Sequence, residues 1–338
     1  MKYTKTDFGK LSDGTTVYKY TLENGKDMAV DIMTFGATVT SIRFDSREMT
    51  LGFDTLEEWE NNKIFAGATV GRFANRIADG KFTIDGETFE LAKNEKPKTL
   101  HGGIKGFDKV VWGAQVMENE ESISLMLFRV SPDGDQGFPG NLDAYVTYTL
   151  NIENELQIDY TATTDKSTHV NFSHHSYFNL SDESNVENHQ VMINAEKFTP
   201  LMENSIPDGK ILPVENTSMD LREMGTLNDA FEKNNGGFDD NFVLNKEDGE
   251  FASVAKVFAA DTGIEMEVLT SKPGIQFYTG NYIKDLKGRN GEVYQQYAGL
   301  CLEPQYFPDT PNQPEFPTSL LTPEEEYFHR IIYRFTRK

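Results

Sequence analysis

Apolar and polar residues alternate along much of this chain, which is the period of β-strands that bury one face. The clearest case spans 142–162, where every second position is apolar on both sides of a tight turn. We therefore predict a long antiparallel ribbon whose buried face is made by Leu142, Ala144, Val146, Tyr148, Leu150 and Ile152, followed by Leu156, Ile158, Tyr160 and Ala162.

Turn residues between alternating segments predict two further hairpins. Asn24-Gly25 lies within the segment 16–44, and Asp85-Gly86 lies at the centre of 82–91. Apolar periodicity also predicts strands at 112–130, 191–198, 264–269 and 327–335.

A helical period of 3.6 residues is almost absent. We predict one short helical turn over 55–61, capped by Asp54 or Thr55. The tract between 198 and 264 is rich in Asn, Asp, Gly and Pro, and we expect it to be irregular apart from its ends. This pattern predicts an all-β fold, an antiparallel sandwich or barrel. No linker-like change in composition marks a boundary, so we expect 1–338 to form a single domain.

The chain has 54 acidic and 32 basic residues, a net charge of −22. This charge repels phosphate backbones and anionic lipid, so we expect neither nucleic acid nor a membrane as a partner. It also weighs mildly against a phosphorylated substrate. The single cysteine, Cys301, lies in the apolar run 298–302 and is expected to be a small buried residue. No segment has the length and apolar character of a membrane span, and the first 14 residues lack the apolar core of a signal peptide. We expect a cytoplasmic location, unless a signal peptide preceded this sequence.

Two segments carry histidines in unusual settings. In LHGGIKG (100–106), His101 precedes two glycines that allow a ligand to approach the backbone closely. In NFSHHSYFNL (171–180), His174 and His175 are adjacent. If that segment is a strand, the two side chains point to opposite faces, so only one can enter a given cleft. An incidental turn histidine and a hydrogen-bonded core histidine are the structural alternatives.

Glu303 is the most informative carboxylate, because the apolar residues 299–302 precede it and shield it from water. Desolvation raises the pKa of a carboxyl group toward the range of a general base, although a loop anchor is the alternative role. Two imidazoles and one shielded carboxyl group form an acid–base set without a nucleophile, since neither a Gly-x-Ser-x-Gly elbow nor a phosphate-binding glycine loop is present. The set favours proton transfer.

Two histidines and a carboxylate also raise the possibility of a metal site. Adjacent histidines on a regular strand cannot both bind one ion, and His-x-His and His-Glu-x-x-His spacings are absent. We therefore do not expect a metal.

Six motifs, in order, resemble those of the aldose 1-epimerases, also called galactose mutarotases. They are GRFANRI (71–77), LHGGIKGFDKVVW (100–112), NFSHHSYFNL (171–180), GGFDDNFVL (236–244), PGIQFYTGN (273–281) and LCLEPQYFPDTPNQPEFP (300–317). The resemblance implies a large antiparallel β-sandwich, the galactose mutarotase-like supersandwich. It also implies that the chain interconverts the α and β anomers of an unphosphorylated aldose, such as glucose or galactose, without a cofactor.

The resemblance also implies residue roles. Glu303 corresponds to the base that takes the proton of the C1 hydroxyl, and His175 to the acid that protonates the ring oxygen, the two facing each other across the bound pyranose. His101 corresponds to a second histidine near the ring oxygen. Further residues correspond to contacts with the sugar hydroxyls or to the pocket lining, namely Asn75, Arg76, Asp239, Gln276 and Tyr177. We expect Tyr278 to pack in the core rather than on the sugar.

Three positions depart from the family pattern. The chain has His174 where asparagine is expected, Asp240 where histidine is expected, and Pro304 in place of the commoner threonine. None of the three removes a proton-transfer group, and they bear on substrate preference.

Three alternatives stay open, namely a non-catalytic sugar-binding module, a cupin-like metal enzyme and a phosphosugar epimerase. The phosphosugar epimerase would need cations at the cleft rim, for which Arg72 and Arg76 are candidates. The expected partner is a monosaccharide, and the expected assembly is a monomer or a weak homodimer.

Overall fold

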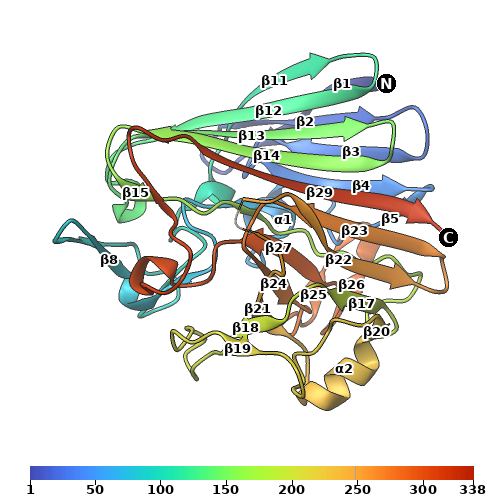
Figure 1. Cartoon of the computed structure of the whole chain (residues 1–338). Helices are drawn as coiled ribbons and strands as arrows, with labels where there is room; N and C mark the ends of the chain where they lie inside the picture. The colour runs from blue at the N-terminus through green and yellow to red at the C-terminus, as the bar shows by residue number, and fades with distance from the viewer. Residues whose placement is uncertain (248) are drawn as a thin grey trace.

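The computed structural model describes residues 1–247 and 249–338. Its largest element is a nine-stranded antiparallel sheet (Figure 1). The C-terminal strand β29, drawn in red, lies inside this sheet between β14 and β23. In spatial order the strands are β11 (Gly113–Glu118), β12 (Ser122–Ser131), β13 (Leu142–Asn151), β14 (Glu155–Thr164), β29 (Tyr327–Arg337), β23 (Ile264–Thr270), β22 (Ala252–Ala259), β17 (Gln190–Ile193) and β20 (Gly225–Thr226).

The predicted ribbon is the β13–β14 pair. Val146 pairs with Tyr160 and Leu150 with Leu156, and all four side chains are buried on the inner face. Ile152 departs from the prediction, because β13 ends at Asn151 and Ile152 is only half-buried in the turn that follows. The period of two therefore predicts burial only as far as the strand extends.

Two five-stranded antiparallel sheets pack against the large one, and a single continuous hydrophobic core contains residues of all three. This arrangement confirms the all-β sandwich. The first sheet contains β1 (Lys2–Lys10), β2 (Thr16–Glu23), β3 (Met28–Met33), β4 (Thr38–Phe44) and β5 (Arg47–Glu48). The second contains, in spatial order, β19 (Leu212–Pro213), β18 (Lys197–Thr199), β21 (Asp239–Val243), β24 (Gly274–Tyr278) and β27 (Cys301–Gln305).

Short elements complete the fold. Five two-stranded pairs are β6 (Thr69–Val70) with β16 (Ser173–His174), β7 (Arg76–Ile77) with β10 (Thr99–Leu100), β8 (Lys81–Ile84) with β9 (Glu87–Glu90), β15 (Thr168–His169) with β28 (Leu320–Leu321), and β25 (Leu286–Lys287) with β26 (Val293–Tyr294). Single 3₁₀ turns span Ala78–Gly80, Phe107–Lys109, Asp135–Gly137, Arg289–Gly291 and Thr310–Asn312. No helix within residues 1–247 and 249–338 is both long and apolar enough to cross a membrane.

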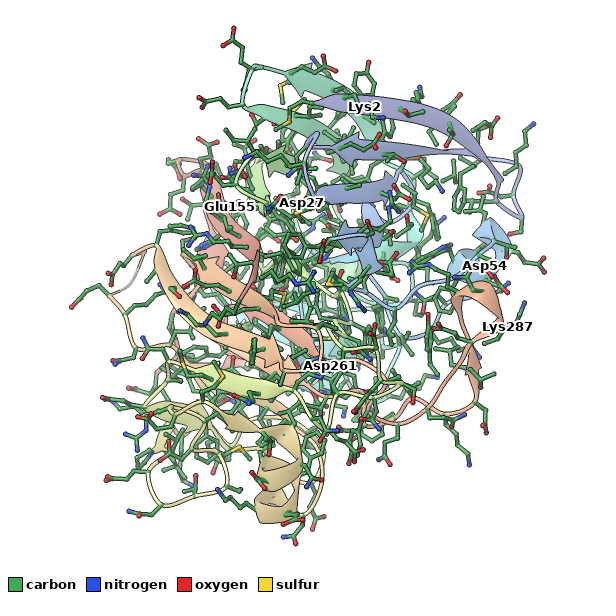
Figure 2. All side chains as sticks on the ribbon, turned by 90° about the vertical axis from the view of Figure 1, so that its right-hand side faces the viewer. Lys2, Asp27, Asp54, Glu155, Asp261 and Lys287 are labelled. Carbon is green, nitrogen blue, oxygen red and sulfur yellow. The ribbon has the colours of Figure 1, made fainter. Side chains whose placement is uncertain are left out.

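The predicted helical turn is α1 (Leu56–Glu60), and Thr55 caps it in a reciprocal capping box with Glu58. The helix lies beside the distant hairpin β25–β26, and Figure 2 labels Asp54 and Lys287 on these two neighbouring segments. Lys287 Nζ lies 2.6 Å from Glu58 Oε1 and joins the helix to the hairpin.

Two predictions for the region after the histidines were wrong. The expected strand 191–198 is two strands, β17 and β18, which belong to different sheets. Buried and exposed residues still alternate at Ala195, where the chain passes from one sheet to the other. The two-residue alternation of the sequence therefore cannot show that the chain changes sheet. The tract expected to be irregular contains β21, β22 and helix α2 (Leu227–Asn234), which Thr226 caps through Asp229 N–H.

Candidate active site

Most of the predicted site residues line one pocket with a volume of about 220 Å³. The pocket lies where β21 and the ends of β24 and β27 meet the segments that carry the two histidines. Seven of the eight residues predicted from the sequence are in its lining: Asn75, Arg76, His101, His175, Tyr177, Asp239 and Glu303. The structure therefore brings together five segments that are far apart in the chain.

One face of the second five-stranded sheet supplies a wall of this pocket. In β27, Cys301 and Glu303 share a face because they are two positions apart. In the antiparallel neighbour β24, Tyr278 lies opposite Cys301 and Gln276 opposite Glu303, so all four point to the same side. Tyr278 consequently lines the pocket, and it also packs against a hydrophobic cluster, as expected from the sequence.

Adjacent histidines point in opposite directions, although β16 includes only Ser173 and His174. His175 Nε2 lies 3.7 Å from Glu303 Oε1 within the pocket. His174 points into the core, where its Nε2 lies 2.7 Å from Ser176 Oγ. Glu303 and His175 therefore lie side by side in one pocket, instead of facing each other across a space the width of a sugar ring.

His101 is the third proton-carrying group of the pocket. Its Nδ1 accepts a hydrogen bond of 3.1 Å from Asn75 N–H, so the hydrogen of the neutral ring is on Nε2 and is available to a ligand. The ring meets His175 edge to face, with centroids 5.3 Å apart. Gly102 makes the turn possible, because a Cβ there would lie 1.9 Å from the carbonyl oxygen of Gly71.

His101, His175 and Glu303 each offer a ligand atom within 4.8 Å of the others, which is the spacing of a metal site. An imidazole that binds a metal uses a bare nitrogen and donates its other N–H to a neighbour. His101 shows the reverse arrangement, since its Nδ1 is an acceptor. Nε2 of His101 therefore carries a hydrogen and is suited to donate a hydrogen bond, not to bind a metal ion.

Burial shifts both members of the Glu303–His175 pair toward their neutral forms. It raises the pKa of the Glu303 carboxyl well above its usual value, and the charge of Asp239 adds to this while Arg76 opposes it. Burial lowers the pKa of His175 to about 4. Glu303 Oε2 is buried without a hydrogen-bond partner in the described part of the chain. The pair thus holds one exchangeable proton, and Oε2 can accept a hydrogen bond.

A charged network also lines the pocket. Arg76 donates from Nε to Glu95 Oε2 at 2.8 Å, and its Nη1 lies 3.6 Å from Asp239 Oδ2. Gln276 Nε2 donates to Asp239 Oδ1 at 2.8 Å. Gln276 itself is not among the lining residues, so its contact with the sugar stays a prediction. It lies behind Asp239 and orients that carboxylate.

Arg72 does not reach the pocket rim. Its side chain is buried, and its guanidinium donates to the carbonyl oxygens of Pro139, Gly140 and Ser131 at 2.8–3.2 Å. Of the two arginines in GRFANRI, only Arg76 lines the pocket.

Sequence reasoning missed several residues that surround the pocket. Phe65 packs on the His101 ring with centroids 4.6 Å apart, and Tyr282 stacks on Tyr278 at 6.1 Å. Both also line the pocket, as do Lys63 and Glu95. The segment that contains Phe65 carries no motif, whereas the spacing of Tyr278 and Tyr282 around a glycine turn was a signal that could have been used.

Fold and site together define an antiparallel β-sandwich protein with an acid–base pocket. The family model for aldose 1-epimerase matches residues 18–334. The galactose mutarotase of Mus musculus is 46% identical over 98% of both chains, and the aldose 1-epimerase of Escherichia coli is 39% identical over 96% of both. The crystal structure of a galactose 1-epimerase from Lactobacillus acidophilus superposes with a TM-score of 0.88 at 28% identity, covering 99% of both chains. The chain belongs to the aldose 1-epimerase family of carbohydrate isomerases.

Proposed function

We propose that this enzyme interconverts the α and β anomers of an unphosphorylated aldose such as glucose or galactose, with Glu303 as the base and His175 as the acid. The observation that carries the proposal is the placement of Glu303 Oε1 and His175 Nε2 in one pocket, 3.7 Å apart. Both oxygens that exchange protons are bonded to the same anomeric carbon. Two groups side by side can therefore serve both oxygens at once.

Ring opening starts with an ionised Glu303 and a protonated His175. Glu303 takes the proton of the C1 hydroxyl, the bond between C1 and the ring oxygen breaks, and His175 Nε2 gives its proton to the ring oxygen. The product is the open aldehyde, with Glu303 protonated and His175 neutral. Rotation about the C1–C2 bond presents the other face of the aldehyde, and the same transfers in reverse close the ring.

Glu303 and His175 together carry the same number of protons before and after ring opening. Because burial disfavours separated charges, the protein environment favours a protonated Glu303 and a neutral His175, which is the state that follows ring opening. Sugar hydroxyl groups that donate to Glu303 shift the pair toward the charged state that starts the reaction. Each positioned acid or base accelerates a reaction by about 10²–10⁴-fold, which is enough for a conversion that already occurs in water.

The remaining lining suits a neutral sugar. Arg76 and Asp239 present a donor and an acceptor to neighbouring hydroxyl groups, with Asn75 beside them and Gln276 holding Asp239. His101 Nε2–H is available as a donor near the ring oxygen. Among the described lining residues the cations are Lys63 and Arg76, and Arg76 is already paired with two carboxylates. A phosphosugar would require more unpaired positive charge.

Polarimetry on freshly dissolved α-D-glucose and α-D-galactose tests the proposal. We expect the enzyme to speed the approach to the equilibrium rotation at catalytic concentrations, and rates equal to buffer across a panel of aldoses would refute the activity. Calorimetric binding of a sugar without anomer exchange would support a non-catalytic binding module instead. Assays with the corresponding 6-phosphates distinguish a phosphosugar epimerase.

A further inference from the structure

Both nitrogens of the His175 ring face side chains of the same strand. Cys301 Sγ lies 3.6 Å from His175 Nδ1, and Glu303 Oε1 lies 3.7 Å from Nε2. Cys301 and Glu303 share one face of β27 because they are two positions apart. A single strand thus fixes both edges of the imidazole.

Cys301 has the chemistry of a hydrogen-bond partner and not of a nucleophile. Its side chain is fully buried beside Tyr177 and Ala298 in an apolar cluster, and burial raises the pKa of the thiol, so it stays protonated. A thiol is a weak donor through S–H and a weak acceptor through sulfur. It can therefore bond to Nδ1 whether or not that nitrogen carries a hydrogen.

We propose that Cys301 is a positioning residue, whose thiol holds Nδ1 of His175 so that proton exchange with the substrate takes place at Nε2. When the ring is neutral, after Nε2 has given its proton to the ring oxygen, Nδ1–H donates to Sγ and the bare Nε2 can take the proton back. When the ring is protonated, Nδ1–H donates to Sγ and the second hydrogen on Nε2 points at the substrate. The role in turnover rests on the proposed function, whereas the contact itself can be tested without it.

Core packing is the competing role for Cys301, and two substitutions separate the roles. Cys301→Ser keeps a donor and acceptor at a small cost in packing, whereas Cys301→Ala removes both but stays apolar. We expect Cys301→Ala to lower kcat by about 3- to 10-fold, the effect of one ordinary hydrogen bond, with KM little changed. Cys301→Ser should retain most of the wild-type kcat.

The proposal would be overturned if the kcat of Cys301→Ala equalled that of the wild type. It would also be overturned if the kcat of Cys301→Ser were as low as that of Cys301→Ala. Thermal melts and circular dichroism confirm that each variant is folded before its rate is compared.

A spectroscopic measurement tests the contact independently of activity. The chain has one cysteine, so its infrared S–H stretching band reports Cys301 alone. At pH 8, where His175 is neutral, we expect the band at a different frequency from that in His175→Phe, which keeps a ring but removes the Nδ1–H donor. Coincident bands in the two proteins would overturn the inference. An inactive wild type with a shifted band would instead refute the proposed function and leave the contact standing.

Discussion

The two sides of the segment 173–177 show how one sequence motif serves two regions. On the core side, His174 packs between Tyr148 and Tyr333, with ring centroids 6.2 and 5.8 Å away. On the pocket side, His175 lies beside Glu303. Burial lowers the pKa of both imidazoles, to about 3 for His174 and about 4 for His175. A shifted pKa therefore does not distinguish the two.

Unpaired atoms do not distinguish the two sides either. Within residues 1–247 and 249–338, His174 Nδ1 in the core and Glu303 Oε2 in the pocket both lack a hydrogen-bond partner. The difference is that only the pocket has room for a ligand and places a second proton-transfer group within reach. Access and a matched partner make a buried histidine chemically useful, so variants on the two sides should fail in different ways.

Glu303→Gln should have the largest effect. The amide keeps the shape of the side chain but cannot accept a proton, so we expect kcat in the polarimetric assay to fall by about 10²–10⁴-fold. Thermal stability should be unchanged or slightly higher, because glutamine avoids an ionisable group in a buried position. Near-native turnover in this variant would contradict the assigned base.

His175→Asn should come next, with kcat lowered by about 10²-fold or more through loss of the acid. Its melting temperature should fall less than that of His174→Asn, because the side chain borders a cavity that water can fill. The matched control is His174→Asn, which makes the same exchange one residue earlier. Equal loss of activity in both variants would show that the two sides are not functionally distinct.

His174→Asn should instead lower stability. It removes the ring contacts with Tyr148 and Tyr333, and we expect the free energy of unfolding at pH 8 to fall by about 1–3 kcal/mol, with turnover close to wild type. Urea unfolding monitored by circular dichroism measures the difference. An unchanged stability would mean that the core side tolerates asparagine as well as histidine.

The smallest expected effect is the pH dependence of the difference in unfolding free energy between the wild type and His174→Asn. The folded-state pKa of His174 is lowered to about 3, so between that value and its ordinary 6.5 the unfolded state binds more protons at this residue. Its contribution to stability is complete above pH 6.5 and is lost as the pH falls. Relative to His174→Asn, the wild type should lose about 1.4 kcal/mol between pH 8 and pH 5.5. A pH-independent difference would contradict the burial of a neutral imidazole.

Local patterns in the sequence determined much of this protein. The period of two predicted the β13–β14 ribbon, Asp85-Gly86 predicted the β8–β9 hairpin, and Thr55 predicted the cap of α1. The apolar run before Glu303 correctly predicted that this side chain is shielded from water, since the run leads into a buried strand. These features depend on a few neighbouring residues, whose steric and hydrogen-bonding preferences act wherever the segment lies.

Only the tertiary structure decided which side chains meet. The crossing between β17 and β18, the burial of Arg72 under distant carbonyl groups, and the position of Gln276 behind Asp239 all depend on partners far along the chain. The contact between Cys301 and His175 joins residues 126 positions apart. Such contacts are set by strand pairing and by the packing of sheets. The local sequence of one segment does not indicate which distant segment it will contact.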